Sequence, residues 1–280
     1  MFAFNHEQVP SAKPKRASVL AFVSNKGGVG KTTSAINVSA AIASAGQRVL
    51  LIDLDSQALA SLGCGLSRPQ LRPSIHDVLL EGLPLSSVIR NKVIHGLDLV
   101  TADIRLANFD LWVWDDCERH LRLTHALDLV RDQYDLIIMD SGPGFNLLKT
   151  NAIVAADAYI IPVTPTYHSA VGFVGTKEAI ELIRGGVGTK AVLLGVLLTL
   201  VDYRFKLTDE FVKLIRRKFG SDIFETEIRQ NVRLAEAPGH GKTIFEYNAM
   251  SSGATNYRDL SDEINQRIET RLSNLSPLSA

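Results

Sequence analysis

Apolar runs and helix-like stretches alternate along most of the chain. The apolar runs lie at 18–24, 47–55, 96–102, 134–140, 157–165 and 191–201. The helix-like stretches between them include 31–46, 118–132 and 172–184. Strands that are apolar over nearly their whole length are typical of a parallel sheet with helices on both faces. The pattern therefore predicts an α/β fold with a single doubly wound, mostly parallel sheet, whose ligands lie beyond the carboxyl ends of the strands.

The two ends of the chain differ from this pattern. Residues 1–17 are rich in Pro, Ser, Lys and Arg and lack the apolar core of a signal peptide. We expect a flexible, basic extension over 1–17, one domain over 18–274 and a flexible tail over 275–280. The apolar run at 191–201 is far shorter than the about 20 residues that a membrane-spanning helix needs. Two cysteines without metal-ligand spacing are typical of a reducing cytosol, so we expect a cytoplasmic protein.

A glycine-rich segment, GGVGKT at 27–32, lies between the first predicted strand and the first predicted helix. The backbone N–H groups of such a loop can surround phosphate groups, while a lysine binds the β- and γ-phosphate oxygens and a threonine hydroxyl binds Mg²⁺. The alternative is a glycine-rich turn that binds nothing, which the flanking strand and helix disfavour. The segment therefore predicts a phosphate site in which Lys31 contacts the phosphates and Thr32 the metal.

Four segments together resemble the ParA/MinD family of ATPases. KGGVGKTT (26–33) matches the family's deviant Walker A motif, VLLIDLDSQ (49–57) resembles its second motif, and YDLIIMDSGP (134–143) resembles its Walker B motif and switch II. NVRLAEAPGHGKTI (231–244) is similar to the C-terminal signature of ParA partition proteins, here of the Soj-like kind that lacks an N-terminal helix-turn-helix domain. The resemblance covers about residues 18 to 270 and implies a P-loop ATPase with ATP and Mg²⁺ as cofactors.

The resemblance assigns a role to a second lysine, Lys26, which stands five positions ahead of Lys31. In the family this lysine reaches the nucleotide of a partner subunit, so that a homodimer encloses two ATP molecules. A lysine ahead of the loop is poorly placed to serve its own γ-phosphate, and a charge offered to a partner's phosphates makes dimerisation depend on nucleotide. The alternative is an ordinary surface lysine. The expected nucleotide contacts are Lys26, Gly27, Gly28, Val29, Gly30, Lys31, Thr32, Thr33 and Asn231.

Three carboxylates follow or end predicted strands. Asp53 and Asp55 are two residues apart, so their side chains begin on the same face of the strand. The resemblance implies that Asp55 orients the attacking water, that Asp53 lies near the outer shell of the metal, and that Asp140 holds a Mg²⁺-bound water. Capping of the strand ends is the alternative role. We therefore expect Lys26, Lys31 and Asp55 to be catalytic, and Thr32, Asp140 and Asp53 to serve the metal.

Some positions depart from the family pattern. Ser56 and the segment SGPG at 141–144 stand where ParA proteins usually have prolines, and Gly142 and Gly144 widen the backbone conformations open to the switch. Arg229 stands where a proline usually lies against the adenine, which puts that contact in question. Asn231 remains the candidate for recognition of the base.

Positive charge gathers near residues 204–218, although the whole chain has thirty basic and thirty acidic residues and no net charge. Six basic residues stand there against Asp209 and Glu210. We expect the helix over 207–219 to bury Leu207, Phe211, Leu214 and Ile215 and to expose its basic residues. The resemblance aligns Arg204 and Arg233 with arginines that bind DNA without sequence preference. The expected DNA-binding residues, here called the basic face, are Arg204, Lys206, Lys213, Arg216, Arg217 and Arg233; a solvated basic surface is the alternative.

These features predict a ParA-like ATPase that dimerises on ATP, binds double-stranded DNA non-specifically in the nucleoid, and moves a cargo through a ParB-like or other adaptor protein. A MinD-like regulator on the membrane surface is the alternative. Its C-terminal helix would be basic, whereas residues 257–280 carry three basic and four acidic residues, so we expect Leu260, Ile264, Ile268 and Leu272 to pack on the domain. The iron–sulfur branch would need a cysteine soon after Walker B, and 141–156 contain none. Trp112 and Trp114 are expected to pack rather than to stack on bases.

Overall fold

The computed structural model describes residues 16–94 and 96–273. Most of the expected extension (1–17) and the whole expected tail (275–280) lie outside these residues. Within them, an eight-stranded sheet has the order β3-β4-β2-β5-β1-β6-β7-β8. The strands are β1 (Ser18–Phe22), β2 (Val49–Leu54), β3 (Ile89–Ile94), β4 (Leu97–Val100), β5 (Leu136–Ser141), β6 (Ala158–Val163), β7 (Val192–Val201) and β8 (Ile228–Arg229).

Neighbouring strands run parallel, except that β3 and β4 are antiparallel at one edge of the sheet. The prediction of a mostly parallel, doubly wound α/β sheet is thus confirmed. The edge strand β3 was not predicted, because Arg90, Asn91 and Lys92 give it no apolar run. An edge strand lies open to solvent, so its side chains need not be apolar.

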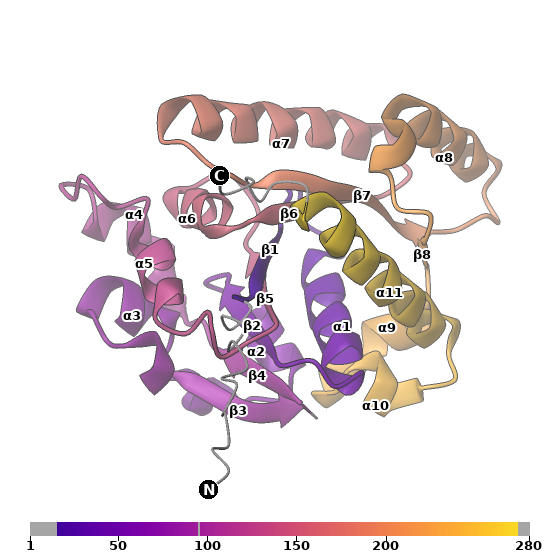
Figure 1. Ribbon diagram of the computed structural model, residues 1–280. Helices are drawn as coiled ribbons and strands as arrows, with labels where there is room; N and C mark the ends of the chain where they lie inside the picture. Colours follow the sequence, from indigo (N-terminus) through magenta and orange to yellow (C-terminus); the bar gives the residue numbers. More distant parts are fainter. Residues whose placement is uncertain (1–15, 95, 274–280) are drawn as a thin grey trace, which may run out of the picture.

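Helices cover both faces of the sheet (Figure 1). They are α1 (Lys31–Ser44), α2 (Leu59–Gly63), α3 (Ile75–Glu81), α4 (Phe109–Trp112), α5 (Arg122–Asp128), α6 (Leu147–Ala155), α7 (Tyr167–Gly186), α8 (Lys206–Phe219), α9 (Val232–Glu236), α10 (Ile244–Asn248) and α11 (Ser252–Ser273). Five 3-10 helices join them: η1 (Arg68–Leu71), η2 (Leu85–Ser87), η3 (Ile104–Asn108), η4 (Gly220–Asp222) and η5 (Ala237–His240).

Alternate residues of each central strand belong to two separate apolar cores. In β1, Val19 and Ala21 pack into the core beneath α3 to α8, whereas Leu20 and Phe22 pack into the core beneath α1, α10 and α11. The pleat of a strand points successive side chains to opposite faces, so a strand covered on both sides is apolar throughout. This arrangement explains the continuous apolar runs of the sequence.

The C-terminal helix α11 lies along α1 (Figure 1). Leu260 and Ile264 are fully buried, and Ile268 packs against the same core. The prediction that this helix packs on the domain is confirmed for these three residues; the side chain of Leu272 lies outside the described part. No helix of the described residues combines the length and apolar character that crossing a bilayer requires.

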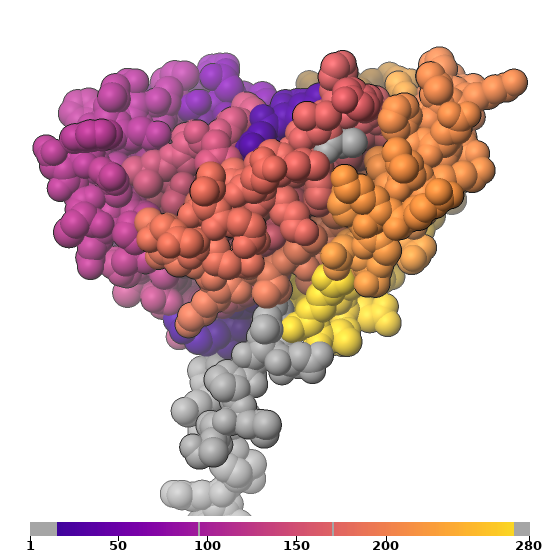
Figure 2. Space-filling view, turned by 90° about the horizontal axis from the view of Figure 1, so that it is seen from above, coloured from indigo at the N-terminus to yellow at the C-terminus, as the bar shows by residue number. Residues whose placement is uncertain are grey.

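The face that helix α8 turns to the protein agrees only in part with the prediction. Ile215 is buried as predicted and Phe211 is partly buried, whereas Leu207 and Leu214 are exposed. The buried residues are Thr208, Val212 and Ile215. These three residues are spaced by four and three positions, so they also form one face of a helix. Phe219 continues that face and packs against Phe173 of α7, with ring centroids 4.4 Å apart. Figure 2 shows α7 and α8 side by side on one surface of the molecule.

Two further expectations were wrong. The helix expected over 118–132 is shortened at both ends to α5: a turn closed by a 2.7 Å bond from the Leu121 N–H to the Glu118 carbonyl oxygen precedes it, and a turn from the Val130 N–H to the Leu127 carbonyl oxygen ends it. Trp112 and Trp114 are each 72% exposed, since Phe109 and Val113 take the buried positions of this segment.

Candidate active site

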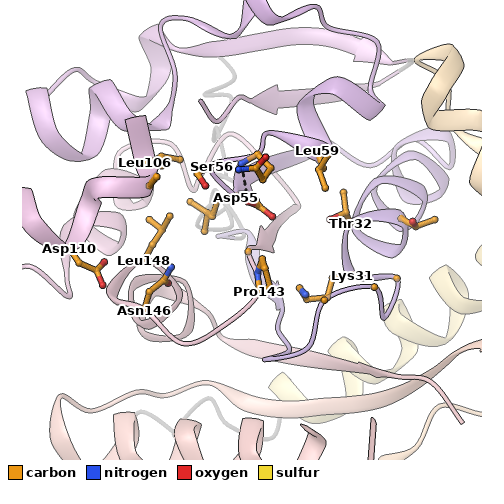
Figure 3. Close-up of a pocket in the computed structure, with 18 residues that line it drawn as sticks. Lys31, Thr32, Asp55, Ser56, Leu59, Leu106, Asp110, Pro143, Asn146 and Leu148 are labelled. Carbon is orange, nitrogen blue, oxygen red and sulfur yellow. Dashed lines mark hydrogen bonds between the residues drawn. The ribbon is translucent and has the colours of Figure 1, made fainter. Parts of the chain in front are cut away.

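A cavity of about 640 Å³ lies beyond the carboxyl ends of β2 and β5 and against the first turn of α1 (Figure 3). Residues from four segments line it: 27–33 before and within α1, 54–59 at and after the end of β2, 106–110 of η3 and α4, and 142–148 after β5 and at the start of α6. The cavity therefore occupies the edge of the sheet that the alternation of strands and helices predicted. Leu106, Ala107 and Asp110 were not foreseen, because no motif marks them.

The loop between β1 and α1 requires glycine at two positions. Gly28 and Gly30 have φ angles of 71° and 76°, in the region that side chains disfavour. Gly30 is also the N-cap of α1 and offers no side-chain cap, so the first N–H groups of the helix remain open to an anion. The Val29 side chain is buried and its carbonyl oxygen accepts a 2.9 Å bond from the Thr199 hydroxyl, which leaves only its N–H for a ligand.

The two lysines of the motif point to different places. Lys31 lines the cavity and its ammonium group donates to the Lys26 carbonyl oxygen at 3.1 Å. Burial lowers the pKa of Lys31, against the opposing effects of Asp140 and Asp55. Lys26 does not line the cavity; its ammonium group donates instead to the Ser169 hydroxyl, on α7, at 3.0 Å. Of these two lysines, therefore, Lys31 is directed to the cavity of its own subunit and Lys26 is not.

Asp140 is a fully buried carboxylate at the end of β5. Neither of its oxygens accepts a hydrogen bond of acceptable geometry from the described residues. Burial raises its pKa to about 8, and the neighbouring Asp53 carboxylate adds to the rise. Buried carboxylates without a partner are rare and typical of sites that hold a cation. Asp140, with the Thr32 hydroxyl on the cavity wall, therefore provides the hard oxygen atoms that Mg²⁺ prefers.

Asp53 is already held by three donors. Its oxygens accept from the Asp55 N–H at 3.0 Å and from the N–H and hydroxyl of Ser61 at 2.8 and 2.7 Å. Burial raises its pKa to about 6. These bonds fix the backbone before Asp55 and the position of α2. The expected place of Asp53 in the outer shell of the metal stays a prediction.

Asp55 is buried and lines the cavity beside the loop that follows β5. One of its carboxylate oxygens accepts from the Gln57 N–H at 3.0 Å. A Cβ atom added to Gly142 would lie 3.4 Å from the Asp55 carboxyl carbon, an ordinary van der Waals distance, so Gly142 faces this side chain across a gap of about one methyl group.

A second, smaller cavity of about 280 Å³ lies on the other side of the phosphate loop. Gly30 and Thr33 form one wall, and Asn231 forms part of the opposite wall. The Asn231 amide is occupied, because its oxygen accepts from the Arg233 N–H at 2.8 Å and its nitrogen donates to the Ser252 hydroxyl at 2.9 Å. Recognition of the base by Asn231 stays a prediction. Lining residues of this cavity that the sequence did not point to include Thr199, Leu200 and Tyr257.

Arg229 does not line this second cavity. Its guanidinium group lies over the Tyr203 ring, 5.7 Å from the centroid. The replacement of the usual proline therefore places no charge in this cavity.

The basic face carries less free charge than the sequence predicted. Four of its six residues form ion pairs with carboxylates: Arg204 with Asp202 at 2.6 Å, Lys213 with Asp209 at 2.6 Å, Arg216 with Glu227 at 2.7 Å and Arg233 with Glu236 at 2.8 Å. Three of these acids lie outside the segment in which the charges were counted. Within the described chain, Lys206 and Arg217 have no ion pair.

Comparison with known proteins agrees with this geometry. The AAA domain family matches residues 17–198. The chain is 35% identical over 246 residues to the sporulation initiation inhibitor protein Soj of Bacillus subtilis, covering 88% of this chain and 97% of Soj. It is 36% identical over 263 residues to the chromosome partitioning protein ParA of Caulobacter vibrioides, covering 93% and 98%. The chain belongs to the ParA/Soj family of partition ATPases.

Solved structures agree with the fold and with the cofactors. The cobyrinic acid a,c-diamide synthase of Mycobacterium smegmatis, solved with ADP and magnesium, superimposes with a TM-score of 0.79 at 26% identity, covering 91% of this chain and 96% of that one. Membership of the ParA/Soj family makes this chain a nucleotide-hydrolysing ATPase that uses ATP and Mg²⁺. The buried, unpartnered Asp140 and the glycine-shaped loop fit both cofactors.

Proposed function

We propose that this ATPase forms a homodimer around two ATP molecules, binds double-stranded DNA without sequence preference, and partitions or positions a cargo. The observation that carries the proposal is that the two lysine side chains lie in different places. Lys31 lines its own cavity, whereas Lys26 is directed away from it toward Ser169. A second lysine that is free to leave a neutral hydroxyl for a partner's phosphates would make dimerisation depend on nucleotide.

The residues around the cavity support hydrolysis in the following way. The N–H groups of residues 27–33 and the Lys31 ammonium group would hold the phosphates, with Asn231 beside the base. Thr32 and Asp140 would hold Mg²⁺, with Asp53 behind them, and the ion would neutralise charge on the phosphate oxygens. Asp55, fixed by the bonds of Asp53 and Gln57, would orient the attacking water.

DNA binding rests on the basic face. The chain has no net charge, so its attraction to DNA depends on a local patch. Dimerisation would place two copies of that patch on one particle, which raises affinity without any new contact. Since ion pairs already occupy four of the six residues, a single subunit is expected to bind DNA weakly.

Release from DNA would follow hydrolysis stimulated by a ParB-like or other cargo-adaptor protein, and the protein would act in the cytoplasm on the nucleoid. The MinD-like alternative gains no support from α11. Its residues Leu260 and Ile264 are fully buried against the domain and are not available to a lipid surface.

The proposal is tested by the ATPase rate of the purified protein with and without duplex DNA and a candidate adaptor. We expect slow turnover alone and a faster rate with both. A rate that neither addition changes would contradict the coupling. A liposome sedimentation assay tests the MinD-like alternative, because a membrane regulator would sediment with anionic vesicles in an ATP-dependent way and a DNA-binding partition ATPase would not.

A further inference from the structure

Lys149, in the first turn of α6, is a lysine whose side chain lies wholly inside the protein. It is 2% exposed. Its ammonium group donates to the Ser24 carbonyl oxygen at 2.8 Å and to the Gly144 carbonyl oxygen. A buried ammonium group is costly unless hydrogen bonds replace its water. These two carbonyl oxygens therefore determine where the side chain lies.

The two carbonyl oxygens belong to two loops that meet at the active site. Ser24 leads into the phosphate loop, whereas Gly144 lies in the loop between β5 and α6. The same glycine donates its N–H to the Asn25 carbonyl oxygen at 3.2 Å. Its φ angle of 75° lets the chain turn at this point. Lys149 and Asn25 thus hold both polar groups of Gly144 against the start of the phosphate loop.

The loop that Lys149 holds is also part of the cavity wall. Gly142 and Pro143 line the cavity, and Gly142 faces the Asp55 carboxylate, which a methyl group at position 142 would touch at 3.4 Å. Lys149 itself does not line the cavity and lies behind this wall. The position of the loop determines the space beside Asp55, where the attacking water would be oriented.

We infer that Lys149 is a positioning residue for hydrolysis, which fastens the loop of residues 142–146 to the start of the phosphate loop and so sets the space beside Asp55. This inference rests on the proposed role of Asp55 in ATP hydrolysis. It concerns a residue that touches neither nucleotide nor metal, and it assigns to α6 a part in the chemistry of the neighbouring cavity.

The charge of Lys149 is coupled to the phosphate site. Burial and, to a smaller degree, the nearby Lys31 ammonium group lower the pKa of Lys149 to about 7, against the opposing effect of Asp55. Phosphate groups bound beside Lys31 would add negative charge and favour the charged form of Lys149. Charge-assisted hydrogen bonds are about twice as strong as neutral ones. Nucleotide binding would therefore favour protonation of Lys149 and strengthen its hydrogen bonds to the carbonyl oxygens of Ser24 and Gly144.

The test compares Lys149→Met with wild type, using the exposed Lys190→Met as the matched control. We expect Lys149→Met to bind a non-hydrolysable ATP analogue with Mg²⁺ within about threefold of wild type, since it keeps every cavity contact, and to lose about tenfold or more in kcat. Calorimetry at pH 7 in two buffers of different ionisation enthalpy measures protons taken up on binding. Wild type should take up on the order of half a proton per site more than Lys149→Met.

Wild-type kcat in Lys149→Met, or proton uptake equal to wild type, would overturn the inference. If the variant does not fold, Lys149→Gln replaces it in both measurements, because its amide can still donate a hydrogen bond from inside the protein but carries no charge. Wild-type kcat together with wild-type proton uptake in Lys149→Gln would also overturn the inference. Proton uptake is measured without turnover, so a failure of the proposed hydrolysis is distinguishable from a failure of Lys149.

Discussion

The phosphate loop and the basic face both gather positive charge, and they hold it in different ways. Lys31 is buried beside unpaired or backbone-held carboxylates and lines a cavity with a defined shape. The basic face is exposed, and carboxylates such as Asp202 and Glu236 already pair with most of it. The first region is organised for a ligand within a single subunit, whereas the second would gain affinity for a polyanion only when many weak contacts act together.

The largest effect is expected from removing the charge of Lys31 in the phosphate loop. Lys31→Ala should weaken binding of ATP with Mg²⁺ at least about 100-fold, because the loop loses the one ammonium group directed to the β- and γ-phosphates. A nucleotide-binding titration measures this, with Lys190→Ala as the control. Affinity close to wild type would mean that the loop binds nucleotide through its backbone alone.

Asp55→Ala separates binding from hydrolysis within the same region. The side chain lines the cavity but is not among the expected phosphate contacts, so the dissociation constant should change less than about threefold while kcat falls at least about 100-fold. A phosphate-release assay gives the rate. The exposed Asp115→Ala serves as the control, and retained turnover in Asp55→Ala would exclude the water-orienting role.

Substitutions in the basic face should have smaller effects, and these should appear in DNA affinity and its salt dependence rather than in ATP binding. Arg204→Ala and Arg233→Ala should leave ATP-driven dimerisation intact and weaken binding to unrelated duplexes equally. Each lost phosphate contact should reduce the slope of log affinity against log salt by about 0.9. Gel shifts over a salt series on two unrelated sequences measure both quantities. Unchanged slopes in both variants would place DNA elsewhere on the protein.

The smallest expected effect comes from the partner acids. Asp202→Asn and Glu236→Gln should raise affinity for duplex DNA about two- to threefold, because exposed ion pairs are weak and their loss frees Arg204 and Arg233 for phosphate. Fluorescence anisotropy at low salt resolves such a change. A decrease in affinity would mean that these carboxylates hold the arginines in their DNA-binding positions.

The contrast between the regions also explains what could be predicted from the sequence. Backbone geometry fixes the phosphate loop, so the spacing of its glycines and Lys31 was sufficient to place the cavity. The basic face was overestimated, because Asp202, Glu227 and Glu236 reach it from outside the counted segment. Lys149 was missed although a lysine stands out in the largely apolar start of α6, since its two carbonyl partners lie in other segments.

The face that α8 buries could not be read from the sequence for a related reason. Leu207 and Val212 are both apolar, and either could mark the buried side of the helix. Phe219 packs on Phe173 of α7, and this tertiary contact lies on the same helix face as the buried Val212. No local sequence pattern indicates it.

The central claim is that ATP bound at the phosphate loop drives dimerisation, and that dimerisation raises the affinity of the basic face for DNA. Lys26→Ala tests this claim most directly. Light scattering and DNA anisotropy are measured on the same samples with ATP and Mg²⁺. We expect Lys26→Ala to bind ATP as wild type does, to remain a monomer, and to lose the ATP-dependent gain in DNA affinity, because its charge serves the partner's phosphates. A variant that still dimerises, or that binds DNA as tightly as wild type while monomeric, would contradict the claim.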